Sequence, residues 1–302
     1  MTTLRHHLRA GLARLPPGVR REVLHRLGRY APWEVEFDFT PPRPGPGEET
    51  GPPDFVGIGA QKAGTTWWYE LMMTHPRLSA PDGVHKERHF FDRFGARAMG
   101  PGDIGQYHGW FPRPPGTLTG EWTPDYIGYP WVPPLLARAA PDTRLLVLVR
   151  DPVDRFRSGL AHLDRMGQPR DGTALADAVR RGFYHRALEG WMDRVDAGAV
   201  LVLQYERCIA DRDGQLDATF RHLGLEPHHP PPETRPAAGD RHQPLDEEVR
   251  RQLVELYAPD VTALADRFGQ LDLTLWPNFA YLAGPAPSPS AGDPGPVPNS
   301  PT

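Results

Sequence analysis

The sequence has one cysteine, two lysines and no long apolar segment among its 302 residues. With Cys208 alone, the chain forms no internal disulfide and offers no cysteine cluster for zinc. The longest apolar run, Leu145–Val149, is far shorter than the ~20 residues that span a bilayer. The N-terminus has no uninterrupted apolar stretch of the kind that marks a secretory signal. We therefore expect no transmembrane segment and a cytoplasmic location.

The charge of the chain is nearly balanced, with 34 Lys+Arg against 38 Asp+Glu and a net charge of −4. A general nucleic-acid-binding protein usually has a strongly basic domain, so we expect no nucleic-acid partner. The only two lysines are Lys62 and Lys86, and all other basic residues are arginines. A lysine in such a chain is a candidate for a task that needs a compact ammonium.

The two ends of the chain differ in composition from its middle. Residues 1–53 form a basic N-terminal extension that is predicted to be helical over 1–32 and ends in a Pro/Gly-rich linker. The basic amphipathic pattern fits helices packed on the domain, or peripheral contact with a membrane surface or a partner. Residues 282–302 are rich in proline, and we expect them to be disordered. The folded domain is predicted at 54–281.

Strand and helix patterns alternate within the predicted domain. Apolar segments at 54–60, 144–150 and 199–205 predict buried strands. Helical patterns occupy 65–74, 173–196, 214–223 and 246–268, and a further helix opens at Asp151-Pro152. This alternation predicts an α/β fold of three layers, P-loop-like, with a mainly parallel central sheet flanked by helices. Ligands of such sheets bind at the carboxyl ends of the strands.

Residues 57–66, Gly-Ile-Gly-Ala-Gln-Lys-Ala-Gly-Thr-Thr, join a buried strand to a helix. A loop of this kind directs backbone amides and the positive end of the helix dipole at an anion. Gly59 and Gly64 have the spacing of the nucleotide P-loop, but Thr65 stands where that motif needs lysine. The lysine lies inside the loop, at Lys62. The segment therefore predicts a phosphate-binding loop whose ammonium approaches the phosphate from a different side.

The segment from Gln61 to Trp67 resembles the 5′-phosphosulfate-binding loop of sulfotransferases that use 3′-phosphoadenosine 5′-phosphosulfate (PAPS). The closest branch is the heparan sulfate or carbohydrate type. The resemblance extends in order over about residues 54–270. Its other segments are His75-Pro76, Lys86-Glu87-Arg88-His89-Phe90-Phe91-Asp92, Glu121-Trp122-Thr123-Pro124-Asp125-Tyr126, Arg150-Asp151-Pro152 with Ser158, and Tyr205-Glu206.

This resemblance implies PAPS as the donor, adenosine 3′,5′-bisphosphate (PAP) as the product, and no metal. It assigns Arg150 and Ser158 to the 3′-phosphate and Arg241 to a late nucleotide loop. A structural alternative is that Arg150 pairs with Asp151 or Asp154 while Ser158 faces solvent. The residues implied at the 5′-phosphosulfate are Gln61, Lys62, Ala63, Gly64, Thr65 and Thr66.

Sulfuryl transfer leaves little covalent chemistry to the protein, so positioning and charge stabilisation dominate. We expect Lys62 to stabilise the leaving phosphate. The resemblance makes Glu87 the base that takes the acceptor proton, with His89 and His85 as further candidates. A carboxylate in this role would need a raised pKa to work near neutral pH. The alternative for Glu87 is a surface ion pair with Lys86 or Arg88.

The chain departs from the family pattern at two places. Trp122 replaces a lysine that is often tied to acidic-sugar recognition, so the acceptor is expected to be a carbohydrate-like or glycosylated small molecule without high charge. An aromatic side chain there suits a sugar face or an apolar acceptor, unless it is buried. In the late nucleotide loop, Gly239 replaces a lysine, and Arg235 is a nearby substitute.

Three other functions remain as alternatives. A P-loop kinase for a small metabolite would need a lysine directly before Thr65. A nucleotide-sugar glycosyltransferase could hold a metal at Asp211-Arg212-Asp213, although acids at a helix start also favour the dipole. A nucleotide-binding module would bind the ligand without turnover.

Overall fold

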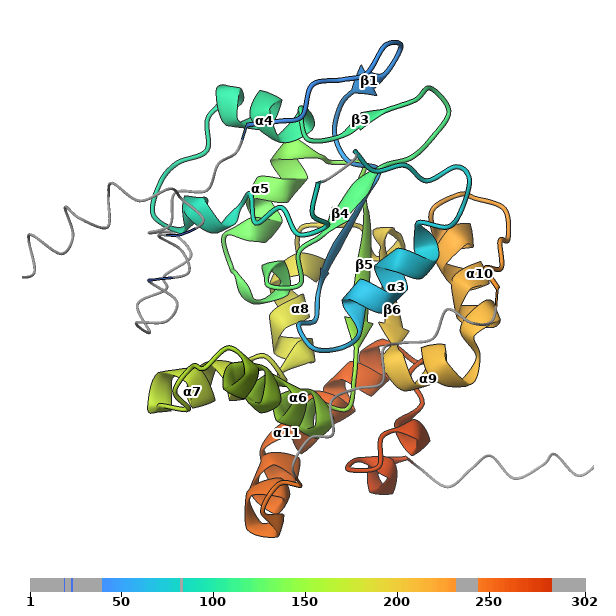
Figure 1. The fold of residues 1–302 in the computed structure, drawn as a ribbon. Coiled ribbons are helices and arrows are strands. Elements are labelled where there is room, and N and C mark those ends of the chain that lie inside the picture. The colour runs from blue at the N-terminus through green and yellow to red at the C-terminus, as the bar shows by residue number, and fades with distance from the viewer. Residues whose placement is uncertain (1–18, 20–22, 24–39, 82–83, 232–243, 284–302) are drawn as a thin grey trace, which may run out of the picture.

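The computed structural model describes residues 19, 23, 40–81, 84–231 and 244–283. Their centre is a four-stranded sheet in the order β4-β2-β5-β6, in which all neighbouring strands are parallel. Figure 1 shows the four strands ending toward the same edge, where β2 turns into the loop before α3. The strands are β2 (Phe55–Gly59), β4 (Gly120–Trp122), β5 (Arg144–Val149) and β6 (Val200–Gln204).

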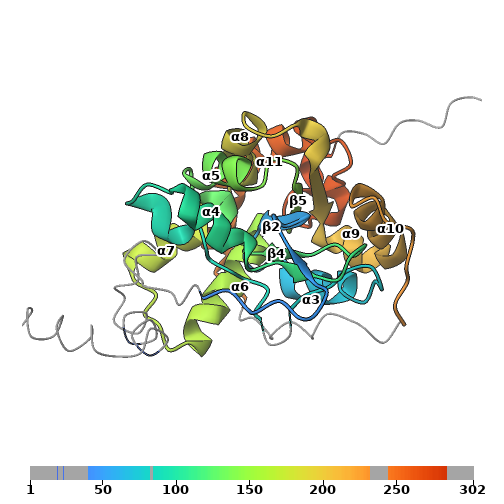
Figure 2. The ribbon, with the colours of Figure 1, turned by 90° about the horizontal axis from the view of Figure 1, so that it is seen from above.

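Helices cover both faces of the sheet, which confirms the expected α/β fold with a parallel central sheet. Seen from above in Figure 2, α3 (Thr65–Met72) lies on one side and α8 (Tyr184–Met192) on the other. The helix α10 (Arg212–His222) packs against α3, and α5 (Val132–Ala139) lies on the side of α8. The remaining α-helices are α4 (Pro101–His108), α6 (Pro152–Arg165), α7 (Gly172–Arg180), α9 (Tyr205–Ala210) and α11 (Glu247–Arg267). Short 3₁₀ turns are η2 (Asp92–Gly95), η3 (Tyr126–Gly128), η4 (Ala197–Ala199), η5 (Leu273–Leu275) and η6 (Ala280–Leu282).

Local sequence explains why these elements begin where they do. Every residue of β2 is buried, as expected for a strand covered on both faces. At the start of α6, the Asp151 carboxylate accepts a hydrogen bond from the amide of Val153 at 2.9 Å, and Pro152 takes the first position. The expected helical pattern at 173–196 is divided into α7 and α8. The division falls at Gly182, where a Cβ atom would lie 2.6 Å from the ring of Tyr257.

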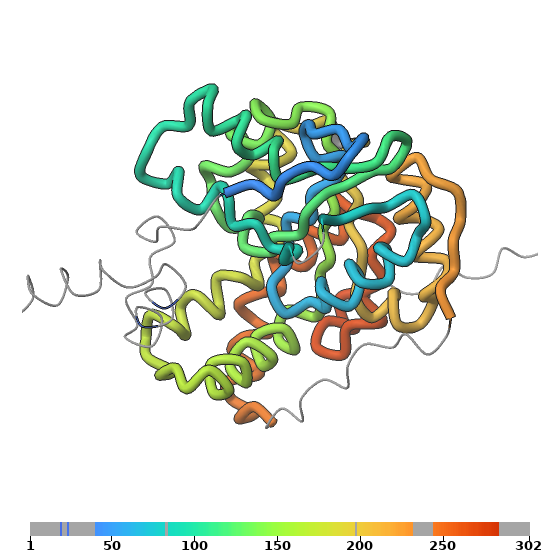
Figure 3. The backbone as a smooth tube through the Cα atoms, turned by 45° about the horizontal axis from the view of Figure 1, so that its top comes forward, coloured from blue at the N-terminus to red at the C-terminus, as the bar shows by residue number. Residues whose placement is uncertain are grey.

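The Pro/Gly-rich segment before the domain contacts it directly. Its strand β1 (Glu49–Thr50) pairs antiparallel with β3 (Pro112–Arg113), and Figure 3 shows these segments side by side. The remainder of the predicted basic extension, apart from Val19 and Val23, lies outside the described residues, as do residues 284–302. None of the helices within the described ranges is both long and apolar enough to cross a membrane.

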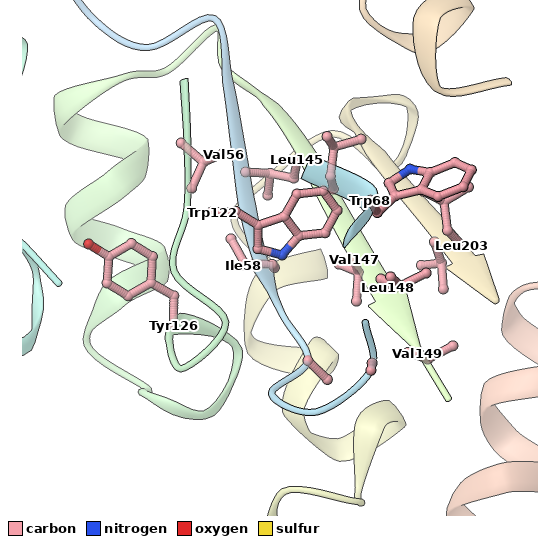
Figure 4. Close-up of a cluster of buried hydrophobic side chains, with 14 of the residues drawn as sticks. Val56, Ile58, Trp68, Trp122, Tyr126, Leu145, Val147, Leu148, Val149 and Leu203 are labelled. Atoms are coloured by element: carbon pink, nitrogen blue, oxygen red, sulfur yellow. The ribbon is translucent and has the colours of Figure 1, made fainter. Parts of the chain in front are cut away.

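The core lies between the sheet and its helices, and Figure 4 shows Trp68 and Trp122 among the aliphatic side chains of the strands. Trp122 is fully buried, and its indole Nε1 donates to the carbonyl of Gly59 at 3.1 Å. Its ring covers Gly57 so closely that a Cβ atom there would lie 2.0 Å from the indole. The tryptophan therefore serves the core, and the expectation that it faces a sugar or an apolar acceptor does not hold.

We predict that Gly57→Ala lowers the free energy of unfolding by about 1–3 kcal/mol, because the indole of Trp122 has to move. Gly102→Ala on α4 is the matched control, since a Cβ atom there meets nothing within 4 Å. The control should stabilise the helix by up to about 1 kcal/mol. Urea unfolding measures both. Equal stability of the two variants would contradict the close packing.

Candidate active site

The loop after β2 leaves the first amides of α3 open at the carboxyl edge of the sheet. The first hydrogen bond of the helix runs from the amide of Trp68 to the carbonyl of Gly64 at 3.1 Å. The amides of Thr65 and Thr66 precede that bond and have no partner within the helix, and no side chain caps this end. Such an end binds an anion through its amides and its dipole. The predicted order of strand, loop and helix is therefore present, and phosphate binding by the loop stays a prediction.

Gly64 is required at this turn for two reasons. Its φ of +91° lies in the left-handed region, which side chains disfavour. A Cβ atom would also lie 2.6 Å from the ring of Tyr205, the residue that follows β6. The guanidinium of Arg150 lies over the same ring, with Cζ 4.9 Å from the centroid. One aromatic ring therefore contacts both the loop and the arginine.

Arg150 follows the last residue of β5, and its Nη1 donates to the carbonyl of Lys62 at 3.5 Å. Within the described residues it forms no ion pair, and its buried Nε has no hydrogen-bond partner. The two acids proposed as alternative partners are engaged elsewhere. Asp151 caps α6 and accepts two hydrogen bonds from Asn278, at 3.1 and 3.0 Å, and Asp154 pairs with Arg157 at 3.0 Å. Arg150 thus keeps donors for an anion at this edge.

Ser158 lies on the second turn of α6, the helix that begins directly after Arg150. It is half-buried and forms no hydrogen bond to another described side chain. Its place in the fold agrees with the predicted role at the 3′-phosphate, but no contact in the structure tests that role. Arg241 and its proposed substitute Arg235 lie outside the described residues.

Lys62 projects from the loop into a region of mixed charge. Burial and the positive charges of Arg165 and Arg181 lower the pKa of its ammonium to about 8, against the attraction of Glu87 and Asp125. Among the described residues, the ammonium forms no hydrogen bond or ion pair. It is therefore mostly charged at neutral pH and available to an incoming anion.

Glu87 lies between two cations. One carboxylate oxygen accepts a hydrogen bond from Lys86 Nζ at 2.6 Å, and the other lies 3.3 Å from His89 Nε2. Burial acts to raise the pKa of Glu87, but the hydrogen bond from His89 and the charge of Lys86 outweigh it and lower the pKa to about 2. The ion pair with Lys86 is the alternative that the sequence left open. The structure therefore does not show the raised pKa that the base role seemed to need.

His89 connects Glu87 to a second, fully buried carboxylate. Its Nδ1 lies 2.8 Å from Oδ2 of Asp92, and its backbone φ is +50°, an unusual value for a histidine. Burial lowers the pKa of His89, yet the hydrogen bonds to Asp92 and Glu87 together raise it to about 10. His89 is therefore protonated at neutral pH and donates from both ring nitrogens.

The backbone of this segment is held by the chain around β4. The amide of Trp122 donates to the carbonyl of Lys86 at 2.9 Å, and the amide of Arg88 donates to the Thr123 hydroxyl at 3.0 Å. Thr123 in turn donates to the buried carboxylate of Glu121 at 2.6 Å. Sequence reasoning gave no role to Thr123, Glu121 or Asp92. Asp92 follows His89 by three residues, and this spacing could have indicated that the two side chains interact.

Comparison with known proteins identifies the family. A model of the Sulfotransferase family matches residues 126–230. Heparan sulfate glucosamine 3-O-sulfotransferase 6 of Mus musculus is 32% identical over 196 residues, which cover 60% of this chain and 55% of the relative. The human protein of the same name is 31% identical over 230 residues, covering 70% of this chain and 65% of the relative. The chain belongs to the sulfotransferase family.

A sulfotransferase from Alicyclobacillus acidocaldarius shares the fold, with a TM-score of 0.60 and 24% identity. That match covers 74% of this chain and 98% of the other. The chain spans about half to two thirds of the length of the two curated relatives above. The family match includes Arg150 and Ser158, whereas Lys62 and Glu87 lie before its first residue.

The acid triplet that suggested a glycosyltransferase has a structural role in this sulfotransferase. Asp211 accepts a hydrogen bond from the amide of Gly214 at 3.2 Å and caps α10. Asp213 pairs with Arg212 at 2.8 Å. Within the described ranges, no three His, Cys, Asp or Glu side chains are grouped as metal ligands.

The histidine should make stability depend on pH in the alkaline range. Because the folded pKa of His89 is about 10 and its ordinary value is 6.5, its protonation stabilises the fold fully below about pH 6.5. That contribution is lost as the pH rises toward 10. The depressed pKa of Glu87 acts oppositely: its contribution is present above about pH 4.5 and is lost as the pH falls toward 2.

We predict that Asp92→Asn moves the pKa of His89 down from about 10 toward 6.5, because the buried negative charge is removed. Titration of the imidazole C–H resonances by NMR measures the change. Asp103→Asn on α4 is the control, since that carboxylate pairs with Arg97 and should leave His89 unchanged. If the pKa of His89 is unchanged in Asp92→Asn, the Asp92 carboxylate is not what keeps the imidazole protonated.

Proposed function

We propose that the protein transfers a sulfuryl group from PAPS to a hydroxyl of a carbohydrate-like or glycosylated small-molecule acceptor. The observation that carries the proposal is the uncapped N-terminus of α3 beside the ammonium of Lys62, which has no ion-pair partner among the described residues and lies within electrostatic range of the Glu87 carboxylate. An anion site next to a proton acceptor is what in-line transfer of an SO₃ group requires. The names of the curated relatives support a carbohydrate acceptor.

The donor would lie across the loop and the start of α6. We propose that Gln61, Lys62, Ala63, Gly64, Thr65 and Thr66 surround the 5′-phosphosulfate, with amides and hydroxyls donating to its oxygens. Arg150 and Ser158 would bind the 3′-phosphate, and Arg241 would close the nucleotide site from its loop. This assignment is supported by the buried Nε of Arg150, which has no hydrogen-bond partner among the described residues. The donor supplies the sulfuryl group, and PAP leaves as the product without a metal.

The acceptor would approach from the side of Glu87. We propose that its hydroxyl oxygen attacks sulfur while the S–O bond to the 5′-phosphate breaks and Lys62 stabilises the developing charge. Glu87 would take the hydroxyl proton, and the negative charge of the bound donor would raise its pKa from about 2. The protonated His89 then orients the Glu87 carboxylate instead of acting as the base, and Asp92 positions His89.

We predict that Lys62→Ala and Glu87→Gln each lower turnover with PAPS by about two or more decades while the fold survives. The first removes charge stabilisation from the leaving group, and the second removes the proton acceptor. Glu70→Gln, on the exposed face of α3, is the control. Turnover is measured as PAP release, and circular dichroism checks the fold. Near wild-type turnover in either variant would remove that residue from the mechanism.

We predict that Arg150→Ala weakens PAP binding about tenfold or more, because a charge-assisted hydrogen bond to the 3′-phosphate is lost. Binding of ADP, which lacks this phosphate, should change much less. Arg144→Ala, at the other end of β5, is the matched control. Calorimetric titration measures both nucleotides. An equal loss for PAP and ADP would mean that Arg150 does not recognise the 3′-phosphate.

A further inference from the structure

A cavity of about 550 Å³ opens beside the phosphate loop. Ala60 and Gln61 of the loop line it, together with residues from 124–133 and from 176–191. Asp125 also lines it, and the charge of this carboxylate acts on both Lys62 and His89. The cavity therefore borders the phosphate loop at Ala60 and Gln61 and lies next to η3, α7 and α8.

The walls of this cavity are mostly apolar because their polar atoms are used elsewhere. The Tyr184 hydroxyl donates to the carbonyl of Arg150 at 2.9 Å. The indole Nε1 of Trp191 donates to the carbonyl of Ile127 at 3.4 Å. Both residues line the cavity, and Val179 adds aliphatic surface. Such a surface favours an apolar ligand, and its volume suits a drug-sized molecule.

Two of the three arginines in the wall, Arg180 and Arg181, are paired with carboxylates. Arg181 pairs with Asp125 and with Asp177, the latter at 2.6 Å, and these carboxylates raise its pKa. Arg180 also pairs with Asp177, at 2.8 Å. The guanidinium of Arg186 lies 5.3 Å from the ring centroid of Phe183. A highly sulfated chain would need cations free to pair with it, whereas Arg180 and Arg181 are held by carboxylates of the protein.

We propose that this cavity binds an uncharged apolar ring system of the acceptor, next to the hydroxyl that is sulfated. The acceptor is then a glycoside or alcohol with an apolar body. The inference rests on the proposed function and specifies its acceptor. In the reaction, acceptor oxygen bonds to sulfur, the bond from sulfur to the 5′-phosphate oxygen breaks, and the hydroxyl proton passes to Glu87.

The test compares two uncharged probes that differ only in their apolar group: 4-methylumbelliferyl β-D-glucoside and methyl β-D-glucoside. Calorimetric titration of the full chain, with and without PAP, measures their affinity. We expect the aryl glucoside to bind about tenfold or more tightly, because two rings leave water. Gly190→Trp should abolish this difference by filling the cavity, since a Cβ atom at Gly190 meets nothing within 4 Å.

Gly105→Trp is the matched control, because Gly105 is also helical and exposed, has equally open surroundings, and lies on α4 away from the cavity. Ala187→Phe provides a second cavity variant in case Gly190→Trp does not fold. Loss of the aryl preference in the cavity variants but not in Gly105→Trp would support the proposal. Equal affinity for the two probes, or an aryl preference that survives both cavity variants, would overturn it.

A heparan sulfate oligosaccharide tests the alternative of a highly charged acceptor. If it is sulfated with PAPS, and both cavity variants leave its kcat/KM unchanged, the cavity proposal fails while the proposed function stands. If PAP does not bind, the proposed function fails and with it the acceptor role of the cavity. The titrations without PAP then show separately whether the cavity binds the aryl ring.

Discussion

The ring of Tyr205 contacts both parts of the proposed donor site and sets their separation. It lies where a Cβ atom of Gly64 would be, and the guanidinium of Arg150 lies over it at 4.9 Å. The phosphate loop follows β2, Arg150 follows β5 and Tyr205 follows β6, so three parallel strands meet at this ring. A residue larger than glycine at position 64 would separate the loop from β6 and displace the open end of α3. Binding of one nucleotide by the loop amides and Arg150 therefore depends on this contact.

Charge at the site is arranged in a buried chain. Asp92 keeps His89 protonated, and His89 and Lys86 together keep Glu87 ionised. The Glu87 carboxylate is thus ionised and able to accept a proton. An anionic donor bound beside it would raise its pKa and make it a stronger base. Lys62, with its pKa lowered to about 8, is the cation of the group that has no ion-pair partner among the described residues. Lys86, Glu87 and His89 lie on a segment that backbone hydrogen bonds attach to the residues around β4. These charged side chains can therefore keep their geometry while the nucleotide enters and leaves.

The fold and the loop between β2 and α3 were predictable because their signals are local. The apolar runs of β2 and β5, the Asp151-Pro152 helix start and the glycine before Thr65 each follow from a short pattern. The charge chain was not predictable, because it needs the left-handed backbone of His89 and the ionisation of its neighbours. The burial of Trp122 depends on a glycine in the adjacent strand β2. The cavity joins segments that lie far apart in the sequence, so its apolar character appears only in the folded chain.

The central claim is that the loop binds a 3′-phosphorylated nucleotide, and thermal stabilisation tests it most directly. PAP, ADP and ATP with Mg²⁺ are compared at equal concentrations with the full chain. A ligand at 100 times its Kd adds about 2.7 kcal/mol to the stability of the folded state, which is easily measured. The account predicts that PAP raises the unfolding temperature most and ADP much less. Stabilisation by ATP with Mg²⁺ alone, or by none of the three, would contradict it.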